Sequence, residues 1–295
     1  MNTIKPLLLW LYYWATLPAR RRAGRQRAQV GTEPVSILLY HRIADQFPND
    51  WTLSRNKFEQ QIDWLTAHYD IVSLEEAQQR IASGRNDRPT VAITFDDGYA
   101  DNSDFAVPML LERKLPFTYF VTSGNVRDRE PFPRDAAAGW RLRPNTVEQI
   151  RELAAAGVEI GAHTRTHPDL GQVTDEHLLR DEIVGAKEDL EAITGESVRY
   201  FSFPFGLQQN MSPTAFAIAH EAGFAGVCSG YGSYNLPGDD PFHLQRIHAD
   251  PQMIRLKNWL TVDQRKLNSP VYNPGDYRQL ASIGSPQPGE LVSAE

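Results

Sequence analysis

Residues Thr90–Gly98, TVAITFDDG, form an apolar and β-branched run that ends in two aspartates and a glycine. The run predicts a buried strand, and Gly98 permits a sharp turn directly after it. Asp96 and Asp97 therefore stand at the carboxyl end of a buried strand. Because Asp-Asp-Gly also occurs in ordinary turns, the pair indicates chemistry only together with a second motif.

The second motif is HTRTH, from His163 to His167, and it follows another strand-like run, Val158–Ala162. Pro168 disfavours a helical backbone at His167, which argues against the helical zinc motif of metalloproteases. A loop that brings both rings to one point fits better. Two imidazoles and two carboxylates supply the ligands of a divalent metal ion and a separate general base.

Short apolar runs alternate with helical patterns along most of the chain. The predicted strands are Val35–Tyr40, Tyr69–Val72, Thr90–Phe95, Phe117–Thr122, Val158–Ala162, Arg199–Phe203, Phe224–Cys228 and Leu244–His248. Such alternation predicts a parallel sheet, and about eight strands favour a closed or nearly closed (β/α) barrel. Functional residues of that fold gather at the carboxyl ends of the strands. Polar candidates do so here, which predicts an enzyme: His41, Asp96, Asp97, His163, Arg246 and His248.

Charge is unevenly distributed. The whole chain carries −7 and residues 1–30 contribute +6, which leaves −13 for the rest. An acidic body argues against nucleic acid as a partner. Cys228 is the single cysteine, which excludes an intrachain disulfide and a cysteine-based zinc site. At the end of a predicted strand it is interpreted as a packed thiol.

The N-terminal run Leu7–Leu17 is apolar and aromatic, and Pro18 is predicted to end it. Its eleven residues fall short of the roughly 20 that cross a bilayer. Three interpretations stay open: a helix on an anionic membrane surface through residues 7–27, a helix packed on the catalytic body, and a poor export signal or anchor. We expect membrane association, with the cytoplasmic face favoured because the following arginines oppose export.

Three regions are therefore predicted. Residues 1–30 form the apolar and basic N-terminal segment, residues 31–261 form the catalytic barrel, and residues 262–295 form a mostly disordered tail with few apolar side chains. Within the barrel, Asn125–Arg143 is predicted as a long, arginine-rich loop near the active face, since loops of this length are usually functional or disordered.

The two motifs resemble the first two motifs of the polysaccharide deacetylases, the NodB-homology domain of carbohydrate esterase family 4. The resemblance covers about Val35 to Asp250. It implies a distorted (β/α) barrel of about seven or eight parallel strands and metal-dependent removal of acetyl groups from N-acetylated sugars. By position Asp96 would be the general base, and Asp97, His163 and His167 would hold a divalent metal, usually zinc.

The third family motif is altered in this chain. Its aromatic residue after proline, whose backbone N–H would hold the oxyanion, corresponds to Phe205, but Ser202 stands where the family has an arginine. We predict that Arg246 replaces that arginine by pairing with Asp96. The predicted substrate contacts are Tyr99, Pro204 and Trp140.

Leu38–Ile43, LLYHRI, is similar to the opening of the permuted subgroup that contains poly-N-acetylglucosamine deacetylases. This resemblance makes His41 the predicted general acid for the leaving amine, with His248 as the alternative. The predicted function is N-deacetylation of an N-acetylhexosamine polysaccharide or lipid-linked glycan. Two alternatives stay open: a hydrolase of another amide, such as a cyclic ureide or a formyl-sugar, and a catalytically silent glycan-binding protein.

Overall fold

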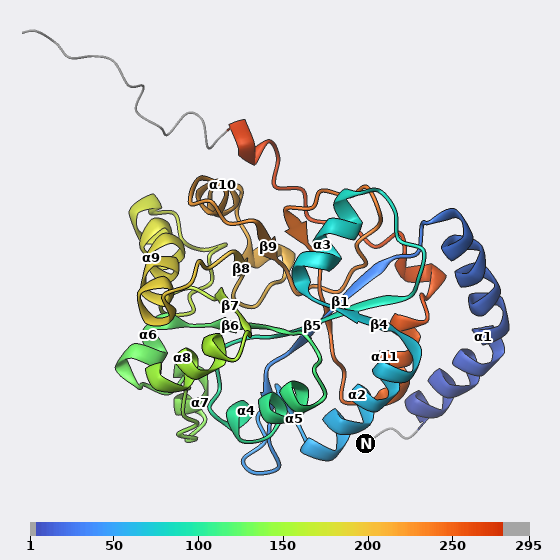
Figure 1. Ribbon diagram of the computed structural model, residues 1–295, viewed down its shortest axis with the longest axis horizontal. Coiled ribbons are helices and arrows are strands. Elements are labelled where there is room, and N and C mark those ends of the chain that lie inside the picture. The colour runs from blue at the N-terminus through green and yellow to red at the C-terminus, as the bar shows by residue number, and fades with distance from the viewer. Residues whose placement is uncertain (1–3, 280–295) are drawn as a thin grey trace, which may run out of the picture.

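The computed structural model describes residues 4–279 as a curled parallel sheet with helices around it (Figure 1). The sheet has nine strands in this part of the chain: β1 (Val35–Tyr40), β4 (Asp70–Val72), β5 (Thr90–Phe95), β6 (Thr118–Val121), β7 (Glu159–Ala162), β8 (Tyr200–Ser202), β9 (Gly226–Cys228), β10 (His243–Leu244) and β11 (Ile247–His248). Their order is β10-β9-β8-β7-β6-β5-β1-β11, and β4 pairs with the start of β5. This is the predicted distorted (β/α) barrel, open between β10 and β11.

The helices connect the strands and cover the outside of the sheet. They are α1 (Ile4–Val30), α2 (Arg55–His68), α3 (Leu74–Ala82), α4 (Asp101–Asp104), α5 (Ala106–Glu112), α6 (Ser123–Asp128), α7 (Pro133–Ala137), α8 (Val147–Ala155), α9 (Glu176–Thr194), α10 (Pro213–Glu221) and α11 (Met253–Leu260). Two short 3₁₀ turns lie at Gln208–Asn210 and Gln264–Lys266, and β2 (Arg42–Ile43) pairs with β3 (Thr52–Leu53). The predicted loop Asn125–Arg143 is therefore interrupted by α6 and α7.

Side chains alternate between two cores along each strand, as strand geometry requires. Outward residues such as Leu38, Ile93 and Phe95 join the large core beneath the helices. Inward residues such as Ile37 and Phe120 join a second cluster, which α3 closes at the amino ends of the strands. The interior is thus filled by apolar side chains at that end, which leaves the carboxyl ends for polar groups.

The last predicted strand, Leu244–His248, is wrong as a single element. Two short strands replace it: β10 pairs with β9 on one side of the opening, and β11 pairs with β1 on the other. Gln245 and Arg246 span the step between them, and both are buried. The chain leaves regular strand pairing at Gln245, whose N–H donates to Asn235 Oδ1 at 2.7 Å.

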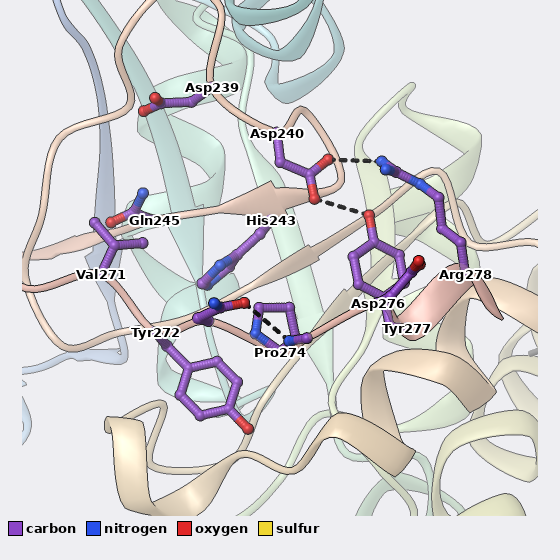
Figure 2. Close-up of a pocket in the computed structure, with 12 residues that line it drawn as sticks. Asp239, Asp240, His243, Gln245, Val271, Tyr272, Pro274, Asp276, Tyr277 and Arg278 are labelled. Carbon is purple, nitrogen blue, oxygen red and sulfur yellow. Dashed lines mark hydrogen bonds and ion pairs between the residues drawn. The ribbon is translucent and has the colours of Figure 1, made fainter. Parts of the chain in front are cut away.

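The region from residue 262 onward differs from the predicted tail. Val262 and Tyr277 are buried against the main core. Figure 2 shows Asp240 accepting hydrogen bonds from the Tyr277 hydroxyl at 2.8 Å and from Arg278 at 2.9 Å. These contacts enclose a cavity of about 780 Å³ beside His243 at the open side of the barrel. The prediction of disorder is wrong for residues 262–279, and residues 280–295 lie outside the described part.

Helix α1 runs along the outside of the barrel beside α11 (Figure 1). It continues through Pro18 instead of ending there. An interior proline costs about 3 kcal/mol, but α1 is held on both sides of it: Tyr13 and Leu17 pack with Ile254, and Arg20 is buried. No helix within residues 4–279 combines the length and apolar character needed to cross a membrane.

The buried Arg20 supplies a test of how α1 is held. Its guanidinium donates to the Asn258 carbonyl and side chain at 3.1 and 2.9 Å and lies 3.7 Å from an Asp263 oxygen. Arg20→Met should lower the free energy of unfolding by about 3 kcal/mol, because buried polar partners lose their donor. Urea denaturation measures this. The exposed Arg22→Met should change stability by less than about 0.5 kcal/mol, and equal losses in both variants would contradict the anchoring role.

Candidate metal and catalytic site

The predicted functional residues converge at the carboxyl ends of the strands. His41 follows β1, Asp96 and Asp97 follow β5, and His163 follows β7. Ser202 ends β8, Arg246 lies between β10 and β11, and His248 ends β11. In a parallel barrel these ends form one rim. A cavity of about 560 Å³ opens there, and His41, Asp96, Asp97, His167, Phe205 and His248 are among its lining residues.

Asp96 and Arg246 form a two-pronged ion pair inside the barrel. Nη1 and Nη2 of Arg246 lie 2.7 Å from Oδ1 and Oδ2 of Asp96, and both side chains are almost fully buried. Arg246 also donates to Ser202 Oγ and to the Ser229 carbonyl. Burial alone would raise the pKa of Asp96, but the guanidinium outweighs it and lowers that pKa. The pairing predicted from the missing third-motif arginine is present, and Asp96 is held as a carboxylate.

Asp97, His163 and His167 each present a ligand atom, and these atoms lie within 4.8 Å of one another. His163 Nδ1 lies 2.8 Å from the Ser202 carbonyl oxygen, which only accepts, so Nδ1 carries the proton. In the neutral ring the bare Nε2 then faces Asp97 Oδ1 at 3.3 Å, and that oxygen has no hydrogen-bond partner among the described residues. Two lone-pair donors aimed at each other fit a cation held between them. The donor set thus fits a metal ion.

The loops that hold these groups adopt an unusual backbone. Asp97, Thr164, His167 and Phe205 all have φ between 61° and 75°, in the left-handed region that residues other than glycine seldom adopt. Such strain concentrates at functional sites, where the surrounding structure holds it. Thr164 shows how: its Oγ1 accepts from the His167 N–H at 3.0 Å, which fixes the turn between the two histidines.

Phe205, the predicted oxyanion donor, lines the cavity beside His167. Its ring is 48% exposed and packs edge-on against the His167 ring at 5.0 Å between centroids. Within residues 4–279 its backbone N–H donates to no other group, although neighbouring Phe203 and Gly206 both bond to the backbone. Gly206 is required beside it, since a Cβ there would lie 2.5 Å from the Gly230 nitrogen.

The predicted substrate contacts divide into two groups. Tyr99 lines the cavity, and its hydroxyl donates to Asp135 at 2.7 Å. Pro204 is buried outside the lining, and Trp140 packs on the cluster of Tyr99, Phe132 and Leu142 instead. The structure therefore brings only one of the three predicted contacts to the cavity surface.

Other lining residues had no sequence signal of their own. Trp51, Phe132, Arg134 and Leu207 stand on the cavity wall. Trp51 lies 5.0 Å from the His41 ring and 5.8 Å from the His248 ring, measured between centroids. Its loop lacks the periodicity that marks strands and helices. The only hint was an aromatic side chain in a polar loop soon after the predicted acid His41.

Both candidate acids lie beside Trp51, with their ring centroids 5.7 Å apart. Nδ1 of His41 is buried and has no hydrogen-bond partner in the described chain. Burial lowers the pKa of His41 to about 4, against the opposing effect of Asp97 and Asp96, and burial also lowers the pKa of His248. His41 is therefore a neutral ring with a buried, unused nitrogen.

Cys228 ends β9 and is fully buried. Burial raises the pKa of its thiol to about 12, so the group stays protonated. It packs with Phe120 and Tyr200 inside the barrel, as a packed thiol should.

Comparison with known proteins agrees with this geometry. Residues 83–227 match the family model described as polysaccharide deacetylase. Residues 83–227 thus form a polysaccharide deacetylase domain by this match. The match begins after β4 and includes both aspartates, both metal-facing histidines and Phe205, whereas His41 and Arg246 lie outside it.

Individual relatives differ in how much they share. The chain is 29% identical over 142 residues to the chitooligosaccharide deacetylase of Sinorhizobium fredii (strain NBRC 101917 / NGR234), which covers 47% of this chain and 56% of the relative. It is 22% identical over 221 residues to the poly-β-1,6-N-acetyl-D-glucosamine N-deacetylase of Staphylococcus aureus (strain MRSA252). This alignment covers 71% of this chain and 72% of the relative. The chain thus spans little more than half the length of the first curated relatives it matches.

A solved structure covers more of the chain. IcaB from Ammonifex degensii superposes with a TM-score of 0.66 at 27% identity, over 78% of this chain and 97% of IcaB. The similarity therefore extends well beyond the segment that the family model matches and supports the deacetylase barrel as the fold of this chain.

The ion pair inside the barrel predicts a specific stability pattern. Arg246→Met should destabilise the protein by about 3–5 kcal/mol, because the buried Asp96 carboxylate loses its compensating charge. Combining it with Asp96→Asn should recover part of that loss, since the uncompensated charge disappears. Guanidinium denaturation of the two single variants and the double variant measures the coupling. A double variant less stable than Arg246→Met alone would contradict the pairing energetics.

Proposed function

We propose that the protein is a metal-dependent N-deacetylase that removes acetyl groups from N-acetylhexosamine residues of a polysaccharide or lipid-linked glycan. The observation that supports this most is Asp96, a carboxylate held by Arg246 directly beside the candidate metal ligands. The named relatives act on chitooligosaccharides and on poly-β-1,6-N-acetyl-D-glucosamine, which makes oligomers of N-acetylglucosamine the first substrates to test.

The ligand set favours zinc. Two imidazoles and one carboxylate are a known protein ligand set of catalytic zinc, with further coordination positions left open. Held by Asp97, His163 and His167, the ion would polarise the acetyl carbonyl and lower the pKa of the attacking water from about 15.7 towards 7.

The chain's own groups supply the remaining steps. Asp96 accepts the proton of the attacking water, since Oδ1 has a lone pair beyond the one that faces Arg246. The Phe205 N–H donates to the oxygen that gains charge as the water adds to the carbonyl carbon. The proton on Asp96 then returns to solvent, and His41 takes up a proton from solvent and gives it to the nitrogen as the C–N bond breaks, which yields acetate and a free amine. Negative charge that develops beside its buried ring raises its proton affinity for this step.

The cavity favours this reaction over the alternatives. Its roughly 560 Å³ and aromatic wall fit a saccharide ring better than a small cyclic ureide. A silent glycan-binding protein was left open by the missing third-motif arginine. The contact between Arg246 and Asp96 supports hydrolysis over that alternative, since it supplies the guanidinium that the third motif lacks.

We also propose that the protein works at a membrane surface, with α1 as the contact. Leu7, Leu8, Leu11 and Trp14 are each about three-fifths exposed on this helix. Exposed apolar side chains followed by arginines suit an interfacial helix. The cytoplasmic face is favoured, since clustered arginines oppose export.

Acetate release tests the proposed reaction. Zinc-loaded protein should release acetate from chitin oligomers or from poly-β-1,6-N-acetylglucosamine, measured by an enzyme-coupled acetate assay. Asp97→Asn should lose both metal, by elemental analysis, and activity. Asp96→Asn should keep the metal and lose turnover by about 10²-fold or more. No acetate from any N-acetylated sugar at full metal occupancy would exclude the proposed function.

The role of His41 predicts a separate outcome. His41→Ala should lower kcat by about 10²–10⁴-fold, the usual effect of a general acid, with metal content unchanged. His248→Ala is the matched control, because its ring lies in the same cavity at the carboxyl end of the neighbouring strand. A larger loss in His248→Ala would assign the acid to that residue, and loss of metal in His41→Ala would make His41 a ligand.

A further inference from the structure

The outer face of α1 has two halves. Leu7, Leu11 and Trp14 follow one another at helical spacing, and Arg21 and Arg25 continue on the same face. The three apolar side chains are 60%, 60% and 62% exposed. The opposite face of the helix is already packed against α11, so barrel packing does not account for this outer face.

The arginine half is not neutralised by the protein itself. Arg20 and Arg27 have acidic partners, Asp263 and Glu33. Within residues 4–279 no acidic side chain pairs with Arg21, Arg22 or Arg25. The body that bears this helix is strongly acidic, with −13 outside residues 1–30. A surplus of positive charge on one edge of an acidic protein predicts an anionic partner there.

A groove of about 280 Å³ lies between α1 and the start of the barrel. Four arginines line it, of which Arg21 and Arg25 have no acidic partner in the described chain, and its apolar walls include Leu17, Trp64 and Tyr69. Glu33 also lines it, but Arg27 occupies both of its oxygens, at 2.9 and 3.4 Å. The groove therefore offers unpaired guanidinium groups beside aromatic rings, and the same arginines lie on the outer face of α1.

We infer that this groove binds the phosphate headgroup of a single anionic phospholipid while the apolar half of α1 rests in the membrane interface. Guanidinium groups bind phosphate through paired hydrogen bonds, and aromatic rings suit the boundary between headgroup and acyl chain. The inference rests on the proposed membrane contact. It adds a defined lipid site and a preference for anionic lipid.

Vesicle co-sedimentation of the full chain separates the lipid site from the membrane contact. Vesicles of phosphatidylcholine alone are compared with vesicles of phosphatidylcholine mixed with phosphatidylglycerol. The double variant Arg21→Gln/Arg25→Gln should bind the mixed vesicles roughly thirtyfold more weakly and the neutral vesicles unchanged. Arg88→Gln/Arg129→Gln is the matched control, with the same charge loss at exposed positions elsewhere, and should retain most of the binding. Thermal unfolding checks that each variant is folded.

The groove itself is tested without changing charge. Gly24 lines it, and a side chain there points towards Arg27 and Glu33 without a clash, so Gly24→Leu should fill the groove in a folded protein. Short-chain dihexanoyl-phosphatidylglycerol, titrated as monomers and followed by calorimetry, should bind the wild-type chain and not Gly24→Leu. Inorganic phosphate in its place should bind at least tenfold more weakly, since it lacks the apolar contact.

Each outcome has one meaning. Failure of the wild-type chain to bind any vesicle overturns the membrane contact together with the lipid site. Equal binding to neutral and anionic vesicles, or short-chain lipid that binds Gly24→Leu as well as wild type, overturns the lipid site alone. Sedimentation as a dimer that Leu11→Asn/Trp14→Asn converts to a monomer, without vesicle binding, would assign the outer face to a second copy of the chain. None of these results bears on acetate release.

Discussion

Arg246 and Asp96 place a positive and a negative charge in the interior of the barrel, where both side chains are almost fully buried. Removing a guanidinium and a carboxylate from water costs several kcal/mol for each ion, and only close pairing with further hydrogen bonds offsets this. Arg246 and Asp96 meet that condition with help from Thr94, Ser202 and the Ser229 carbonyl. These groups come from β5, β8, β9 and the step between β10 and β11. The pair therefore ties the segment at the opening of the barrel to β5 and at the same time fixes the position of the Asp96 carboxylate.

The step between β10 and β11 allows this pair to form. A continuous strand there would alternate its side chains in and out at fixed spacing. The break instead lets Arg246 enter the interior while Ile247 and His248 pair with β1. The neighbouring loops also depart from regular backbone, with left-handed residues such as Asp97 and His167. Strain of about 1–3 kcal/mol at each such residue persists only where the surrounding structure is rigid.

How much could be predicted from sequence depended on whether a feature was local. Two six-residue, fully buried strands, Val35–Tyr40 and Thr90–Phe95, were predicted to the residue. The break in Leu244–His248 was missed because it reflects a gap between strand edges that no local pattern encodes. Trp51 was missed for a similar reason, since it reaches the cavity from an irregular loop, and Arg134 was missed because the helix α7 that carries it was predicted as a loop. Arg246 is not local to the motif either, but it was predicted. Because the third motif lacks its arginine, a substitute that pairs with Asp96 was expected from another strand.

For the N-terminal helix, packing on the body and contact with a membrane do not exclude each other. The sequence suggested packing on the body or contact with a membrane, as if the apolar run had one face. Successive side chains of a helix point in different directions, and the run Leu7–Leu17 has apolar side chains on two faces of the helix. One face packs with Ile254, and the other leaves Leu11 and Trp14 in solvent. Pro18 lies on the exposed side, and the packed residues on either side of it keep the helix continuous across the position where it was predicted to end.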